Sequence, residues 1–194
     1  MTITWQGDNY FKFKTNGISV ICNPYSLNKK IKAAKARAEL ILFSDPSCLT
    51  EAKFDSSSFV ISDPGEYEYK GVFVYGQQIN GKIVYSLIIE DTKVAFLGEY
   101  GHDELSDSNL EFLEGADILI LPIGGGDLTS VKEAGKIIRQ VEPRIIIPSC
   151  FKKEQIDDFV KEIGLKPEET DKFNIKKKDL PQEDMKLVAL KNSL

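Results

Sequence analysis

Residues 93–126 decide which fold class this chain can belong to. They contain two apolar runs, at residues 94–97 and 118–121, with a helix signal between them at residues 106–114. The first run leads into the acidic, glycine-flanked segment 98–103, and the second leads into Gly124-Gly125-Gly126. Strand, helix and strand in succession are typical of α/β sheets, in which loops at the carboxyl ends of strands carry binding groups. We therefore predict an α/β fold with its functional loops at these two places.

The rest of the chain predicts a strand-rich first half, and helices that alternate with strands in the second half. Apolar periodicity separates strands from helices, and serine, glycine and proline mark the helix ends. Thr15-Asn16-Gly17 indicates a hairpin, because Asn-Gly readily adopts positive φ, and residues 77–80 are expected to form a short loop. The predicted strands are residues 2–5, 10–14, 18–22, 39–43, 59–62, 67–74, 82–89, 93–97, 118–121, 144–148, 173–176 and 185–190, and the predicted helices are residues 106–114, 130–141 and 154–163.

The length of the chain, 194 residues, suits one domain with a full core or a tightly joined pair of small ones. We predict a single domain, residues 1–194. The order of the elements allows helices to cover both outer faces of two packed sheets.

Composition and charge argue against nucleic-acid and membrane partners. The formal charge is −5, whereas phosphate binding depends on Lys and Arg. Lysines cluster at residues 29–35 and 176–178; a solvated surface is the favoured interpretation, and a local basic face is the alternative. No apolar run approaches the roughly 18 residues of a membrane span, and no signal peptide is visible. Cys22, Cys48 and Cys150 lack CxxC spacing, which predicts reduced thiols in a cytoplasmic protein.

Several colinear segments carry a resemblance that spans nearly the whole chain. They are residues 4–7, 23–25, 38–44, 63–68, 70–72, 96–98, 121–125 and 142–148. With these segments the chain resembles the metallo-β-lactamase-fold hydrolases, and within them the small bacterial and archaeal proteins related to ascorbate-6-phosphate lactonase. The resemblance implies an αββα sandwich of two packed mixed sheets flanked by helices, with a metal site between the sheets at their loop ends.

The residues at the metal-ligand positions of that family differ in this chain. The family's histidine-rich loop is similar in position to residues 44–50, and its other ligands lie in three further motifs. The matching positions here are Asp45, Ser47 and Thr50 for three histidines, Leu49 for an aspartate, Asp8 and Cys150 for an early and a late histidine, and Glu99 for the metal-bridging aspartate. A hydrolytic zinc site needs about three imidazole, thiolate or carboxylate ligands, so the ordinary site is not rebuilt and no metal is expected.

Two interpretations of the remaining polar groups stay open. The resemblance brings Asp8, Asp45, Glu99 and Cys150 together, either as a substitute site for a divalent metal such as Mg, Mn or Zn, or as a solvated pocket in which Asp8 and Asp45 cap backbone amides. His102 could be a ligand or a general base, and is more often simply exposed in such a loop.

Two further motifs have a functional and a structural interpretation. Cys150 could be a nucleophile if His102 lies near enough to act as its base, and a buried inert thiol is the favoured alternative. Gly124-Gly125-Gly126 lacks the Lys-Ser/Thr of a phosphate-binding loop and is interpreted as a turn.

The sequence thus predicts a catalytically degenerate, metal-free member of this fold that acts as a binding or assembly module. Its expected partners are copies of itself, through sheet edges or an outer helix, or another protein, with no membrane and no nucleic acid. The alternative is a metal-dependent phosphoester or lactone hydrolase with a remodelled carboxylate site, in which Glu99, His102 and Cys150 are the catalytic candidates.

Overall fold

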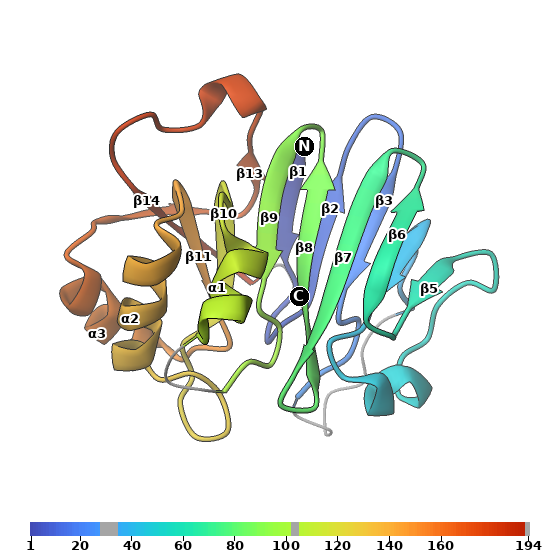
Figure 1. The fold of residues 1–194 in the computed structure, drawn as a ribbon, viewed down its shortest axis with the longest axis horizontal. Helices are drawn as coiled ribbons and strands as arrows, with labels where there is room; N and C mark the ends of the chain where they lie inside the picture. The colour runs from blue at the N-terminus through green and yellow to red at the C-terminus, as the bar shows by residue number, and fades with distance from the viewer. Residues whose placement is uncertain (28–34, 102–104, 193–194) are drawn as a thin grey trace.

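Two β-sheets packed face to face make up most of the molecule (Figure 1). The computed structural model describes residues 1–27, 35–101 and 105–192. The first sheet has the strand order β13-β1-β2-β3-β4-β5, and the second has the order β12-β14-β11-β10-β9-β8-β7-β6. The strands are β1 (Thr2–Trp5), β2 (Phe11–Lys14), β3 (Ser19–Cys22), β4 (Leu40–Leu42), β5 (Phe59–Ile61), β6 (Gly65–Tyr69), β7 (Val72–Ile79), β8 (Lys82–Ile89), β9 (Thr92–Phe96), β10 (Ile118–Pro122), β11 (Ile145–Ser149), β12 (Pro167–Thr170), β13 (Phe173–Asn174) and β14 (Lys186–Leu190).

Both sheets are mixed. In each sheet the parallel strands have their carboxyl ends on the same side. Strands β3, β4 and β5 run parallel, as do β9, β10 and β11. The hairpins β1–β2–β3 and β6–β7–β8–β9 are antiparallel. The loops after β3 and β4 therefore begin at the carboxyl ends of adjacent strands in the first sheet, and the loop after β9 begins at a strand end of the second sheet. Side chains from distant parts of the sequence can meet at such strand ends.

The main core lies between the sheets and follows from strict alternation along the strands. In β8, Ile83, Tyr85 and Leu87 point into this core, and in β1 Ile3 and Trp5 do so. Each fully buried side chain of this size stabilises the fold by about 1.5–3 kcal/mol relative to exposure. The inter-sheet layer therefore holds the two sheets together.

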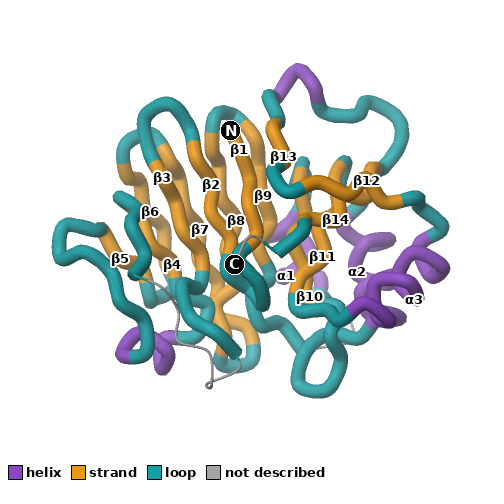
Figure 2. The backbone as a smooth tube through the Cα atoms, turned by 180° about the vertical axis from the view of Figure 1, so that it is seen from behind, coloured by secondary structure: helices purple, strands orange, loops and turns teal. Residues whose placement is uncertain are grey.

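Three α-helices cover the outer face of the eight-stranded sheet: α1 (Asp107–Leu113), α2 (Val131–Val141) and α3 (Lys153–Ile163). Their apolar faces pack on Ala95, Leu119, Leu121 and neighbours in a second core. Figure 2 shows the six-stranded sheet from behind. On this side, among the described residues, the 3₁₀ helix η1 (Pro46–Thr50) and adjoining segments pack on Ile41 and Phe43. A second 3₁₀ helix, η2 (Lys177–Asp179), precedes β14.

The predicted fold class is confirmed: two packed mixed sheets are flanked by helices in an α/β fold. The predicted helices and most strands agree with the structure to within a few residues. None of the helices in the described ranges has the length and apolarity needed to cross a membrane.

Two local predictions were wrong, and a third was right about the hairpin but wrong about its turn. Residues 67–74 are not one strand, because Lys70 and Gly71 adopt positive φ and form a hairpin turn between β6 and β7. Residues 77–79 belong to β7 and not to a loop. The hairpin predicted at residues 15–17 is present between β2 and β3, but its turn does not use positive φ at Asn16. Instead, the Thr15 hydroxyl oxygen accepts from the backbone N–H groups of Gly17 and Ile18.

Candidate functional site

The candidate site gathers side chains from four segments at the carboxyl-end edge of the strands. Tyr25 follows β3, Asp45 follows β4 as the N-cap of η1, and Glu99 follows β9. Lys82 is the first residue of β8, placed there by the tight Asn80-Gly81 turn, in which both residues have positive φ. Strand ends of both sheets thus supply one cluster of polar groups.

Lys82 occupies the middle of this cluster. Its ammonium group forms ion pairs with the carboxylates of Asp45 and Glu99, at 3.0 Å from Glu99 Oε2. The Tyr25 hydroxyl donates to the other oxygen of Glu99. Asp45 Oδ1 accepts from the Ser47 N–H and hydroxyl, at 2.9 and 2.7 Å. We call Tyr25, Asp45, Lys82 and Glu99 the Lys82 centre.

Partial burial strengthens these charge interactions. The side chains of Lys82, Asp45 and Glu99 are 32%, 18% and 10% exposed. Burial acts to raise the pKa of Asp45, but hydrogen bonds from Lys82 and Ser47 outweigh it, so the pKa lies below its ordinary value. Burial acts to lower the pKa of Lys82, and the hydrogen bonds to Asp45 and Glu99 outweigh it and raise the pKa. Lys82 is therefore a cation, and Asp45 an anion, over a wide pH range.

Two side chains at the centre are neutral: Tyr25, which is part of it, and Cys48, which lies next to it. Burial, and after it the charge of Glu99, raises the pKa of the Tyr25 hydroxyl far above its ordinary value. Burial, followed by the charges of Asp45 and Glu99, raises the pKa of the Cys48 thiol to about 11. Cys48 is therefore a thiol at neutral pH, and neither group is a ready nucleophile.

Asn23, Ser44 and Gly98 pack closely beside the Lys82 centre and fix the loops that carry it. The side-chain oxygen of Asn23 accepts from the backbone N–H of Ser44 at 2.7 Å, which ties the loop after β3 to the loop after β4. Gly98, at φ +57°, lies against Ser44, and a Cβ there would come within 2.0 Å of the Ser44 hydroxyl oxygen. Glycine at this position therefore lets the β9 loop approach closely enough to present Glu99.

Asp8 and Cys150 belong to a neighbouring hollow of about 630 Å³, which shares Tyr25 with the Lys82 centre. Asp8 Oδ2 accepts from the Ser26 hydroxyl at 2.8 Å and from the Leu27 N–H at 2.9 Å. The Cys150 N–H donates to the Asp8 carbonyl at 3.2 Å. Burial, and after it the charge of Asp8, raises the pKa of the Cys150 thiol well above its ordinary value.

The predicted site residues lie in two adjoining places, and the charge of Glu99 also acts on the thiol of Cys150 in the hollow. Asp45 and Glu99 meet, Asp8 and Cys150 lie together in the adjacent hollow, and Ser47 serves Asp45 as a hydrogen-bond donor. Leu49 packs in the core beneath η1, and Thr50 is exposed at the end of η1. His102 lies outside the described residues, as does most of the lysine cluster 29–35.

Sequence reasoning missed Lys82, Tyr25 and Cys48 as parts of the site. The Asn80-Gly81 pair is a strong hairpin signal, which could have placed Lys82 at the sheet edge. Nothing in the sequence connects it to Asp45, 37 residues away.

One group of side chains among the described residues could hold a metal ion. Ligand atoms of Asp45, Cys48 and Glu99 lie within 4.8 Å of one another. The fit is poor, because a divalent cation would have to displace the Lys82 ammonium from both carboxylates. Cys48 would also have to lose a proton, although its pKa is raised to about 11.

Fold and site together define the class of protein. A family model described as "Beta-lactamase superfamily domain" matches residues 2–149, and the chain belongs to this family.

Relatives and solved structures agree with this membership. A UPF0173 protein of Pyrococcus abyssi is 27% identical, with 78% of this chain and 83% of that protein covered. A Thermotoga maritima protein, named as a candidate Zn-dependent hydrolase of the metallo-beta-lactamase superfamily, has a crystal structure similar to this one, with a TM-score of 0.81 and 25% identity over 98% of this chain and 99% of that one. The metallo hydrolase Igni18 of Ignicoccus hospitalis has a TM-score of 0.58 at 13% identity, over 84% and 90% of the two chains, and shares the fold.

The name of the Thermotoga maritima protein accords better with a metal-dependent hydrolase than with a metal-free binding module. The chain thus has the fold of a metallo-hydrolase superfamily, whereas its own polar residues form an ammonium–carboxylate cluster at the strand ends.

Proposed function

We propose that this chain is a metal-free member of the family that works as a binding module, with an ammonium group where a cation would otherwise be held. The observation that supports this is the pairing of Lys82 with both Asp45 and Glu99. The likeness to the ascorbate-6-phosphate lactonase branch and the loss of its metal-ligand motifs belong to the same proposal, as does a cytoplasmic location.

Electrostatics supports the proposal. Two carboxylates close together repel each other and need a positive charge between them. Lys82 supplies that charge from within the chain, and the Tyr25 hydroxyl takes a further lone pair of Glu99. A divalent cation that entered would meet a fixed positive charge and carboxylates already engaged.

The shape and lining of the adjacent hollow are evidence that the proposed ligand is a small organic molecule. It is concave, has a volume of about 630 Å³, and combines aromatic and polar walls, as ligand sites in proteins commonly do. Its lining includes Trp5, Asp8, Tyr25, Phe151 and Gln155. Tyr25 connects the walls of this hollow to the Lys82 centre, so binding there would be sensitive to the centre's charge.

The test compares metal binding by the wild-type protein and by Lys82→Met. We expect negligible bound metal in the purified wild type by mass spectrometry, and no change in its Tm on adding Zn²⁺, Mn²⁺ or Mg²⁺. Lys82→Met frees Asp45 and Glu99, so at least one of these ions should raise its Tm, because a ligand bound only to the folded state stabilises that state. Lys14→Met, an exposed position on β2, is the matched control. Near-stoichiometric metal in the wild type would overturn the proposal.

The second candidate function is a metal-dependent hydrolase of phosphoesters or lactones. The grouping of Asp45, Cys48 and Glu99 and the names of the structural neighbours favour it. It requires metal-stimulated turnover that Glu99→Ala abolishes while the protein stays folded by circular dichroism. Turnover that survives in Glu99→Ala would rule out this site for such an activity.

A further inference from the structure

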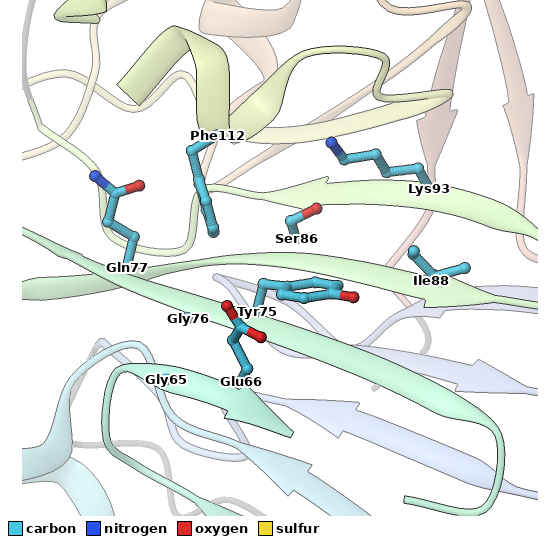
Figure 3. A pocket seen from close by; sticks show the side chains of 9 residues that line it. All are labelled: Gly65, Glu66, Tyr75, Gly76, Gln77, Ser86, Ile88, Lys93 and Phe112. Carbon is cyan, nitrogen blue, oxygen red and sulfur yellow. The ribbon is translucent and has the colours of Figure 1, made fainter. Parts of the chain in front are cut away.

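The outer face of β6, β7 and β8 is a second surface with the features of a binding site. Here α1 borders the face on one side, and a hollow of about 580 Å³ lies beside the helix (Figure 3). Its floor is the sheet, and Phe112 of α1 forms a wall. This face shares no residue with the Lys82 centre, so a partner bound to it is independent of the proposed function.

The strand register shows which side chains share this face. Glu66, Tyr75 and Ser86 form one row across the three strands, and Glu68, Phe73, Ile88 and Lys93 form the next. Phe73 is 43% exposed, which is unusual for a large apolar side chain on a strand that is paired on both sides. Ser86 is 2% exposed, and its hydroxyl has no hydrogen-bond partner within the described part of the chain. The face therefore combines an apolar centre with an unsatisfied polar group.

Opposite charges flank this apolar centre. Glu66 is exposed on the edge strand β6, and its carboxylate takes part in no ion pair or hydrogen bond among the described residues. Lys93 lies three strands away on β9, where its ammonium donates to the Glu114 carbonyl at 2.5 Å. Burial lowers the pKa of Lys93, and the charges of Glu114 and Asp117 offset this only in part. An additional carboxylate beside Lys93 would therefore be favourable.

The distribution of charge also excludes one way of pairing two copies. If β6 added to β6 of another copy as an antiparallel edge, centred on Tyr67, Glu66 of each copy would lie opposite Glu68 of the other. Like charges directly opposite each other destabilise a strand pair, and acidic side chains protect exposed edges in this way. This register of the edge strands is therefore disfavoured, which leaves the face of the sheet as the surface considered for a second copy.

We propose that the face formed by Glu66, Phe73, Tyr75, Ile88 and Lys93 binds a second copy of this chain about a two-fold axis. A two-fold interface uses the same patch on both copies, so residue i of one copy contacts residue j of the other, and the reverse. With Glu66 of each copy on Lys93 of the other, both charge pairs form at once and the apolar centres cover each other. Phe73 is the central apolar contact.

Charge reversal and sedimentation analysis test this interface. We expect the wild type to self-associate in analytical ultracentrifugation, and Glu66→Lys and Lys93→Glu each to raise the dimer Kd at least about tenfold, because each variant places like charges opposite each other twice. An equimolar mixture of the two variants should recover dimers, since the mixed pair restores both attractions. Asp171→Lys makes the same charge change at an exposed site off the patch and should leave Kd unchanged.

Several outcomes would overturn the proposal. A wild type that stays monomeric at several hundred micromolar would do so, and so would unchanged association in Glu66→Lys. If Lys93→Glu does not fold, Phe73→Ser replaces it: Phe73 is exposed, so this variant should fold and lose dimerisation. Dimers that persist in Phe73→Ser would place the interface elsewhere. If the wild type is monomeric and retains a small molecule, the hollow binds that ligand and the dimer proposal is wrong.

Discussion

The Lys82 ammonium is paired with the carboxylates of Asp45 and Glu99, so each charge is compensated by a neighbour. Removing one partner would leave a half-buried charge without compensation, which costs more than the pair contributes when intact. Asp45 has a second role, because its carboxylate also caps the first turn of η1 through Ser47. Asp45→Asn separates the two roles, since an amide oxygen can still cap the turn.

We expect Asp45→Asn to lower the free energy of unfolding by about 1 kcal/mol at pH 7. The folded-state pKa of Asp45 lies below its ordinary value, so its ionisation stabilises the fold at pH values above the unfolded-state pKa. This contribution is lost as the pH falls through the folded-state pKa. Urea unfolding between pH 3 and 8 should therefore show the two proteins converging at the acid end. Asp171→Asn is the control, and parallel curves for Asp45→Asn and wild type down to pH 3 would contradict the assignment.

The sequence named Asp45 and Glu99 but not the lysine between them. Both acids follow predicted buried strands, so their place at a sheet edge could be inferred from pattern. The position of Lys82 depends on how the β7–β8 hairpin lies across the two sheets, which no local pattern encodes. Asp8 was also expected to meet them. Its carboxylate lies in the adjoining hollow, where it accepts from the Ser26 hydroxyl and the Leu27 N–H, in agreement with the interpretation of Asp8 as a cap of backbone amides.

Helix α2 shows why the helices were the best-predicted elements. Its apolar residues recur with helical period and pack on the eight-stranded sheet, so periodicity and packing agree. Ser130 accepts from the Glu133 N–H, and Glu133 accepts from the Ser130 N–H, in a capping box. In contrast, β12 was missed because Pro167–Thr170 is short, polar and paired only with β14.

Replacing the cap should destabilise the protein measurably. We expect Ser130→Ala to lower the free energy of unfolding by about 1 kcal/mol, because the N–H groups of the first turn lose their acceptor. Ser130→Asp should keep most of that stability, since its carboxylate can accept from the same N–H. Urea midpoints at constant m-value give the comparison. Equal losses in the two variants would mean that packing, and not capping, explains the effect.

The two sheets share one core, which indicates that the described chain folds as a unit. Side chains from β1, β2, β8, β9 and β14 contact each other in the inter-sheet cluster, and β1 pairs with β13 from the far end of the sequence. Neither sheet could bury its inner face alone. The single domain predicted for residues 1–194 stays a prediction, and cooperativity is its test.

We expect one unfolding transition. Trp5, the single tryptophan, lies in the inter-sheet core, so its fluorescence reports on contact between the sheets. Far-UV circular dichroism reports on the helices and strands together. The two signals should give the same midpoint if the protein unfolds in a single cooperative step. Separate midpoints would mean that the sheets unfold independently.

The position of β14 also has a consequence for the order in which the strands can pair. This strand is the last one along the chain, yet it lies inside the eight-stranded sheet, between β12 and β11, and runs parallel to both. Among the described residues, β12 is the edge strand of this sheet and pairs with β14 alone. It can therefore join the sheet only after β14 has paired with β11, so this side of the sheet forms from the inside outwards and against the order of the chain.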